Sequence, residues 1–101
     1  MATGWRVDCH AHIIVPQRFP YADGPGYKPR PDETGEDDAF RRVLATHGIS
    51  HALLVQPSCY GYDNACMLDA MARSGGRFKG IAMVAPDGTV AKGSQTAQVF
   101  A

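Results

Sequence analysis

The sequence predicts an α/β fold in which parallel strands alternate with helices. Short apolar runs bounded by glycine or proline are typical of buried strands, and the segments between them carry apolar residues at helical spacing. Along the chain the order is strand, loop and helix, strand, helix, strand. This alternation indicates parallel strands joined by right-handed crossovers, as in doubly wound sheets and (β/α)8 barrels. In both architectures the reactive groups lie at the C-terminal ends of the strands.

The first half of the chain is expected to hold one strand, one long loop and one helix. The strand covers residues 5–15 and becomes apolar toward its end. Several prolines and glycines exclude regular structure from residues 16–35, and a loop of that length in a compact domain is commonly functional. A helix follows, with Asp37 or Asp38 as its N-cap and Gly48 at its end.

The second half is expected to hold a strand, a helix and a further strand. Residues 52–56 form a short apolar run before Pro57, which predicts a strand buried on both faces. The helix spans residues 64–73 and turns Met67, Leu68 and Met71 toward the sheet. Residues 80–85 then predict a third buried strand.

A polar motif of Asp8, His10 and His12 carries the chemistry that the sequence reveals. Alternate residues of a regular strand share a face, so these three side chains are expected on the same face. Two imidazoles at this spacing can reach one metal ion or one substrate group, and a nearby carboxylate can fix their tautomer. For Asp8 we expect a supporting hydrogen bond rather than catalysis. The alternative is that both histidines are surface residues of a half-polar strand.

Composition excludes several classes of protein. Lys+Arg 10 balance Asp+Glu 10, so no basic field favours nucleic acid or an anionic membrane. No apolar run has the length to span a bilayer, and the first residues lack the features of a signal peptide. We therefore expect a cytoplasmic protein without nucleic-acid or membrane partners. Cys9, Cys59 and Cys66 lack a Cys-x-x-Cys spacing and are expected to be reduced thiols.

Two parts of the sequence carry a resemblance to a known family. They are the run Asp8-Cys9-His10-Ala11-His12, followed by Pro16, Phe19, Pro20 and Tyr27, and the run Val55-Gln56-Pro57-Ser58-Cys59-Tyr60-Gly61-Tyr62-Asp63-Asn64, followed by Leu68-Asp69-Ala70. Together they resemble the amidohydrolase-related, metal-dependent hydrolase family, and within it the 2-pyrone-4,6-dicarboxylate lactonase group. The resemblance extends over about residues 5–87.

The resemblance implies the N-terminal βαβαβ portion of a (β/α)8 (TIM) barrel, from an enzyme that hydrolyses a carboxylated lactone such as a pyrone dicarboxylate. His10 and His12 would be the catalytic groups, and would be the ligands of a divalent metal such as zinc if one is used. The lactonase group is thought to manage without a metal, so both cases stay open. Tyr27 and Ser58 would contact the small carboxylated substrate.

The chain departs from this family in length. A (β/α)8 barrel has eight strands and typically about 250 residues, whereas this sequence predicts three strands. We expect residues 1–88 to be the N-terminal part of a barrel domain and residues 89–101 to be a tail outside it. Such a part is expected to be inactive alone and to form homo-oligomers through its open sheet edges. The alternatives are a fragment of a metal-dependent decarboxylase, a non-catalytic remnant, and a small metal-binding protein that uses Cys9, His10 and His12.

Overall fold

The computed structural model of the chain describes residues 4–24 and 26–87. Its strands are β1 (Val7–Ala11), β2 (His51–Val55) and β3 (Phe78–Ile81). They form one sheet in the order β1-β2-β3, and both pairs of neighbouring strands are parallel. The predicted α/β class with parallel strands is therefore confirmed.

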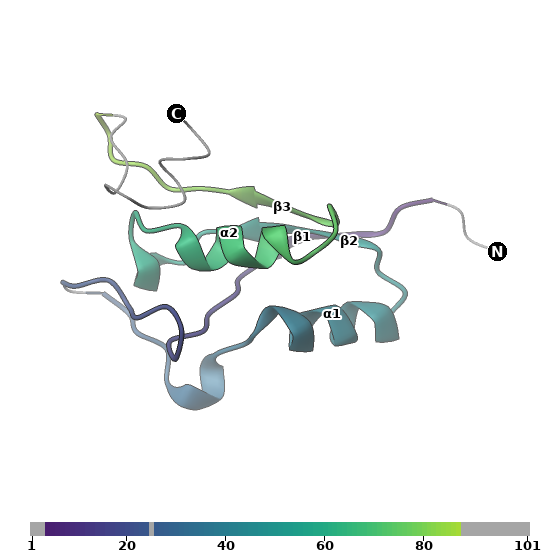
Figure 1. Cartoon of the computed structure of the whole chain (residues 1–101), viewed down its shortest axis with the longest axis horizontal. Coiled ribbons are helices and arrows are strands. Elements are labelled where there is room, and N and C mark those ends of the chain that lie inside the picture. The colour runs from purple at the N-terminus through teal and green to yellow at the C-terminus, as the bar shows by residue number, and fades with distance from the viewer. Residues whose placement is uncertain (1–3, 25, 88–101) are drawn as a thin grey trace.

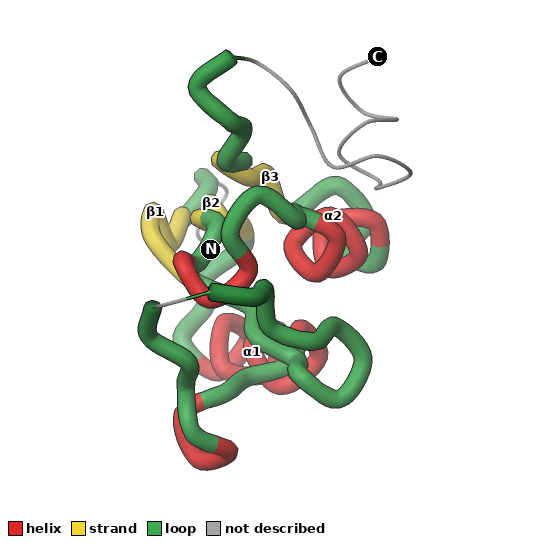
Figure 2. Tube along the Cα trace, turned by 90° about the vertical axis from the view of Figure 1, so that its left-hand side faces the viewer, coloured by secondary structure: helices red, strands yellow, loops and turns green. Residues whose placement is uncertain are grey.

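Both α-helices lie on the same side of the sheet. They are α1 (Asp37–Thr46), which leads from β1 to β2, and α2 (Ala65–Ala72), which leads from β2 to β3. Figure 1 and Figure 2 show the strands as one layer and the two helices as a second layer. A parallel sheet with its connecting helices on one side is the repeating unit of a (β/α)8 barrel.

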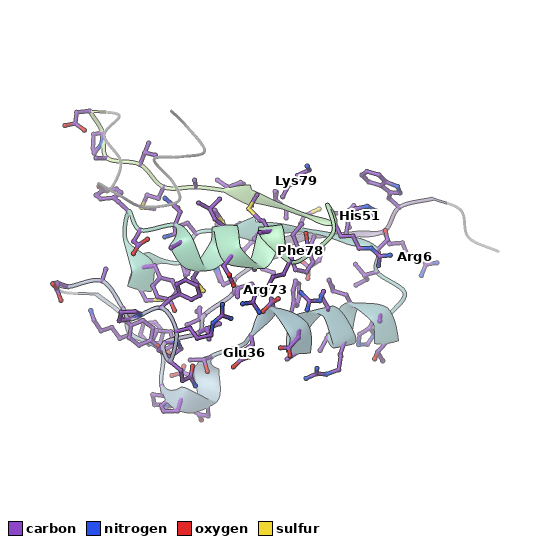
Figure 3. The ribbon with its side chains drawn as sticks, in the orientation of Figure 1. Arg6, Glu36, His51, Arg73, Phe78 and Lys79 are labelled. Atoms are coloured by element: carbon purple, nitrogen blue, oxygen red, sulfur yellow. The ribbon has the colours of Figure 1, made fainter. Side chains whose placement is uncertain are left out.

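Within the described residues, the sheet is covered on one face only. Along β2, Ala52 and Leu54 are 3% and 0% exposed, whereas Leu53 between them is half-buried on the other face. In β3, Phe78 points toward the helices and Lys79 points away from them (Figure 3). The prediction that β2 is buried on both faces is wrong for this portion, because an apolar run does not show which layers are present to cover it. We call the uncovered side the open face.

The core lies between the sheet and the helices. Phe40 of α1 packs against Phe78 of β3 with ring centroids 5.6 Å apart. The core contains buried side chains from the strands, the helices and the segments between them: Ile13, Val15, Leu44, Ala52, Leu54, Cys59, Tyr60, Cys66, Met67, Ala70 and Phe78. Because Ile13 and Val15 belong to this core, the segment that leaves β1 is anchored to the fold.

The start of α1 differs from the prediction. Glu36 occupies the N-cap position, and Asp37 is the first helical residue, buried and 2.6 Å from the guanidinium of Arg41. The prediction of Asp37 or Asp38 as N-cap is wrong, because the Asp37 carboxylate binds a cation one turn further along the helix. The predicted end is confirmed, since Gly48 follows the helix with a φ of 66°, a left-handed conformation that favours glycine.

Helix α2 packs closely on β3. Met67 and Met71 both face the sheet at Gly80, as their helical spacing predicts. A Cβ atom at Gly80 would lie 2.7 Å from Sδ of Met71, so a larger residue would force the methionines to shift. Strand β3 begins before the predicted residues 80–85, because the charged Lys79 interrupts the apolar run although it belongs to the strand and points to the open face.

The long loop after β1 is irregular, as predicted, apart from one turn of 3-10 helix, η1 (Pro31–Glu33). The strand ends earlier than predicted because Ile14 turns away from β2 and pairs with Gly35 in an antiparallel bridge. Backbone hydrogen bonds of 3.0 and 3.1 Å join these two residues. The bridge therefore closes the loop at its base.

Some expectations concern parts or properties that the structure does not test. The predicted tail, residues 89–101, and the domain boundary at residue 88 lie outside the described residues. Strands β1 and β3 form the two edges of the described sheet, and self-association through them stays a prediction. Among residues 4–24 and 26–87, no helix has the length and apolar character to cross a membrane.

Candidate functional site

Strand β1 contains an extra residue where it pairs with β2. Asp8 pairs with Ala52 and Ala11 pairs with Leu54, so β1 advances by three residues while β2 advances by two. This irregularity is a β-bulge. Ala52 and Leu54 lie on the helix-covered face, and partners in a parallel ladder share a face, so Asp8 and Ala11 lie on the helix-covered face as well.

The bulge decides where the two histidines point. His10 and His12 flank Ala11 and therefore point to the open face, where both side chains are exposed. Their rings lie edge to face with centroids 5.2 Å apart, and we call them the histidine pair. The prediction that these imidazoles share a face is confirmed. The prediction that Asp8 shares it is wrong, because the bulge reverses the alternation between Asp8 and His10.

A hydrogen bond fixes the chemical form of His12. Its Nδ1 lies 2.8 Å from the carbonyl oxygen of Val55, the last residue of β2. Because a carbonyl only accepts hydrogen bonds, Nδ1 carries a proton, and in the neutral imidazole Nε2 then presents a lone pair. Nε2 of His12 can therefore bind a metal ion or accept a proton, and the neighbouring strand sets the orientation of the ring.

The other two histidines lie at the opposite end of the sheet. His51, labelled in Figure 3, pairs with Val7 at the start of both strands. Its ring stacks on Trp5 with ring centroids 3.8 Å apart. His47 follows the last turn of α1. Neither contributes to the site around the histidine pair, because both lie at the end of the sheet where β2 begins.

Tyr27 lies on the long loop and is 61% exposed. Its hydroxyl donates a hydrogen bond to Oε2 of Glu33, and Oε1 of Glu33 accepts the backbone N–H of Arg30 at 2.9 Å. The bond between Tyr27 and Glu33 raises the pKa of the phenol and lowers the pKa of the carboxyl, because it stabilises the protonated phenol and the ionised carboxylate. The loop therefore holds Tyr27 through a carboxylate of its own.

Ser58 begins η2 (Ser58–Tyr60), a turn of 3-10 helix after β2, and its side chain is exposed. The backbone N–H of Ala22 donates to the carbonyl of Cys59 at 2.9 Å, which joins this turn to the long loop. In the part of the chain that the structure describes, neither Ser58 nor Tyr27 makes a hydrogen bond or ring contact with the histidine pair. The predicted substrate contacts are thus placed on two adjoining loops but not against the imidazoles.

A cleft of about 390 Å³ opens beside the long loop. It is lined by a glutamine, a tyrosine and three prolines: Pro16, Gln17, Tyr21, Pro29 and Pro31. The hydroxyl of Tyr21 donates to the carbonyl of Pro29 at 2.9 Å and holds the two sides of the cleft together. The lining includes neither of the predicted substrate contacts, so the cleft adds no support for their roles.

Sequence reasoning missed two buried amides that hold the segment between β2 and α2. Gln56 donates from Nε2 to the carbonyl oxygens of Gly61 and Asp63, at 3.1 and 2.9 Å. Asn64 is fully buried, donates to the carbonyl of Met83 at 2.9 Å and accepts the N–H of Met83 at 3.0 Å. In the sequence, these two amides are visible only as polar residues on either side of a glycine-containing turn. Amides are common in turns and at helix caps, so the sequence alone does not indicate that they are buried.

The cysteines do not join the histidine pair. All three are free thiols, as predicted, and burial raises the pKa of Cys59 and of Cys66. Cys9 is exposed on the open face beside Val7 and Leu53. Among the described residues, no group of three or more histidine, cysteine, aspartate or glutamate side chains is placed to hold a metal ion. Since zinc takes three or four protein ligands, the histidine pair fits two positions of such a site.

Acidification is expected to release the hydrogen bonds of Glu33. The hydroxyl of Tyr27, and secondly the N–H of Arg30, hold the pKa of Glu33 below 4.5. A carboxyl whose pKa is lowered by folding stabilises the folded loop above its ordinary pKa, and this contribution is lost as the pH falls through the lowered value. An NMR titration should therefore show the Glu33 carboxyl carbon and the Arg30 amide shifting together below pH 4.5.

Two phenylalanine variants test this assignment. Tyr27→Phe removes the hydroxyl hydrogen bond that lowers the pKa of Glu33 most, so this pKa should rise toward 4.5. Tyr62→Phe, at an exposed tyrosine after η2, is the matched control and should leave that pKa unchanged. An unsubstituted chain in which Glu33 titrates at or above 4.5 would contradict the assignment, as would a Tyr27→Phe variant that titrates like the unsubstituted chain.

Comparison with known proteins defines the class to which this fold and site belong. Residues 7–96 match the amidohydrolase family, so the chain belongs to that family. The family is generally metal-dependent. The matched residues include all three strands and the histidine pair at the end of β1.

Particular relatives are hydrolases of lactones. The chain is 37% identical over 84 residues to the 4-sulfomuconolactone hydrolase of Hydrogenophaga intermedia, covering 82% of this chain and 27% of that protein. It is 37% identical over 79 residues to the 2-pyrone-4,6-dicarboxylate hydrolase of Comamonas testosteroni, covering 77% of this chain and 25% of that protein. The chain thus spans about a quarter of the length of these relatives.

A solved structure shows the same architecture. It is a probable 2-pyrone-4,6-dicarboxylic acid hydrolase from Acinetobacter baumannii with citric acid bound. The TM-score is 0.67 at 34% sequence identity, over 79% of this chain and 29% of that one. The described βαβαβ unit therefore corresponds to part of an amidohydrolase (β/α)8 barrel, as the sequence predicts.

Proposed function

We propose that this chain is part of an enzyme that hydrolyses a carboxylated lactone, with a pyrone dicarboxylate as the first candidate substrate. The observation that carries the proposal is the 37% identity, over most of the chain, to two hydrolases named for such lactones. The solved relative holds citric acid, a tricarboxylic acid, which supports a carboxylated ligand. The exposed histidine pair on the open face supplies groups suited to this chemistry.

Lactone hydrolysis adds one water molecule across the ring ester. The water oxygen bonds to the carbonyl carbon, the ring C–O bond breaks, the leaving ring oxygen takes up one proton to become a hydroxyl group, and the new carboxylate is left with release of the other proton. The attacking water must lose a proton, and Nε2 of His12 can accept it because the bond to Val55 keeps the proton on Nδ1. His10, whose ring centroid lies 5.2 Å from that of His12, is placed to orient the same water or the ester carbonyl.

The histidine pair also fits two positions of a divalent metal such as zinc, because neutral imidazole nitrogen is a good zinc ligand. A bound metal would supply a more acidic water as the nucleophile. His10 and His12 would be the ligands in that case, and no third histidine, cysteine, aspartate or glutamate of the described residues joins them. The two imidazoles therefore serve hydrolysis either as ligands or by acting on the water directly.

Tyr27 and Ser58 are the proposed contacts for the substrate carboxylates. In a barrel, the loops that follow neighbouring strands converge at one face, and the hydrogen bond between Ala22 and Cys59 already joins these two loops. The Tyr27 hydroxyl donates to the carboxylate of Glu33, so it is preorganised to donate to an acceptor of the same type. A substrate carboxylate would take the place of Glu33.

A chimera tests the proposal. The remaining part of the barrel is supplied from the Comamonas testosteroni hydrolase, and the product is assayed on 2-pyrone-4,6-dicarboxylate with and without a chelator. We expect hydrolysis of the lactone that tolerates the chelator. A folded chimera that acts only with added zinc, and only by releasing carbon dioxide, would replace lactone hydrolysis with decarboxylation.

Substitutions in the chimera test the roles of the residues. His10→Ala and His12→Ala should each lower kcat by about 10²- to 10⁴-fold, as for a group that transfers a proton. Tyr27→Phe should lower activity, and Ser58→Ala should chiefly raise KM by about tenfold through one lost hydrogen bond. His47→Ala, at the opposite end of the sheet, is the matched control and should leave both constants unchanged. Full activity of the His10→Ala and His12→Ala variants would contradict the assignment.

A further inference from the structure

The side chain of Asp8 makes a hydrogen bond within the β-bulge of β1. Oδ1 of Asp8 accepts the backbone N–H of His10 at 3.2 Å. This bond spans the stretch between Asp8 and Ala11 in which β1 carries its extra residue. A bulge leaves one residue outside the regular ladder, and the Asp8 carboxylate supplies an acceptor for a backbone donor within it.

The length of the aspartate side chain suits this contact. Aspartate and asparagine can bring a side-chain oxygen to the backbone N–H two residues further along, which offers the backbone an alternative to the regular ladder. Without the bulge, strict alternation would place His10 on the same side as Asp8, beneath the helices. An imidazole there would face the apolar core instead of the open face.

We propose that Asp8 is a positioning residue, whose carboxylate holds the bulge that turns His10 to the open face beside His12. The assignment deepens the proposed function, on which it rests for the role of the two imidazoles. Asp8 acts through the backbone of His10 and lies on the opposite face from both rings. It is therefore neither a ligand nor a proton donor in this arrangement, and the described residues place it in no metal-binding cluster.

Copper(II) nitrilotriacetate probes the arrangement of the rings in the chain as it exists. This complex keeps free coordination positions, which two neighbouring imidazoles can fill together. Mutation of a residue that orients a metal-binding side chain typically costs about 10- to 100-fold in metal affinity. Asp8→Ala should therefore bind the probe at least about tenfold more weakly. The proton NOE between the rings of His10 and His12, whose centroids lie 5.2 Å apart, should disappear in the same variant.

Two further variants separate position from charge. Asp8→Asn keeps the Oδ1 acceptor without the charge and should restore both the copper affinity and the NOE. Asp8→Glu keeps the charge but moves the carboxylate by one methylene and should behave like Asp8→Ala. The matched control is Asp38→Ala, which removes an exposed carboxylate that also accepts a backbone N–H, from Ala39 at 2.9 Å, and should change neither readout.

The proposal is overturned if Asp8→Ala retains the NOE and the copper affinity of the unsubstituted chain. It is also overturned if Asp8→Glu restores them while Asp8→Asn does not, because charge would then be the property required. An equal loss in Asp38→Ala would assign the effect to general destabilisation and would likewise overturn it. Neither readout needs turnover, so a chimera that fails to hydrolyse lactone contradicts the proposed function alone.

Discussion

Asn64→Ala is expected to lower the free energy of unfolding by about 2–4 kcal/mol, as for a buried amide whose partners lose their hydrogen bonds. Asn64 is fully buried, and its side chain makes three hydrogen bonds with the backbone of Tyr62 and Met83. Alanine would leave the N–H and carbonyl of Met83 without these partners. Urea denaturation followed by circular dichroism measures the loss.

An exposed amide provides the control for this result. Gln17→Ala should change the free energy of unfolding by less than about 0.5 kcal/mol, as is usual at exposed positions. Asn64→Asp should remain destabilising, because it keeps one acceptor but removes the donor and buries a carboxyl. If Asn64→Ala cost no more than Gln17→Ala, the link between the start of α2 and the exit of β3 would not stabilise the fold.

Leu54→Ala is expected to cost about 2–5 kcal/mol of unfolding free energy, the range measured for such truncations in well-packed cores. Leu54 is 0% exposed and lies at the centre of the layer between the sheet and the helices. Truncation would leave a cavity that the surrounding side chains fill only in part. The same denaturation experiment measures this loss.

The neighbouring leucine makes the matched comparison. Leu53 lies on the open face of β2 and is half-buried, so Leu53→Ala should cost less than about 1.5 kcal/mol, because little apolar area returns to water. Equal costs at Leu53 and Leu54 would contradict the assignment of one covered and one open face. Such a result would show that another surface covers the open face in solution.

The spacing of His10 and His12 predicted their common face, but for a reason that holds only in part. Period-two alternation is correct between these two residues and fails between Asp8 and His10. The failure depends on one side-chain hydrogen bond, which propensity and periodicity do not encode. The order and direction of the strands were predictable because they follow from the alternation of elements along the chain.

Long-range contacts explain what else the sequence did not predict. Asn64 and Met83 are far apart in the chain, and nothing in either local segment indicates that their backbone and side chain meet. The tautomer of His12 likewise depends on Val55, a residue of the next strand. The roles of Tyr27 and Ser58 stay predictions, because each role concerns a substrate rather than a contact within the chain.

The antiparallel bridge between Ile14 and Gly35 has a consequence for how this rim of the barrel can evolve. The bridge fixes the two ends of the long loop, so the chain between them can change length without moving β1 or α1. The entropic cost of closing a loop rises only slowly with its length, so insertions there would cost little stability. Within the loop, Ala22 should stay in place, because its backbone N–H donates a hydrogen bond to the carbonyl of Cys59 in η2. The loop can therefore lengthen on either side of Ala22 while the strand that carries the imidazoles is preserved.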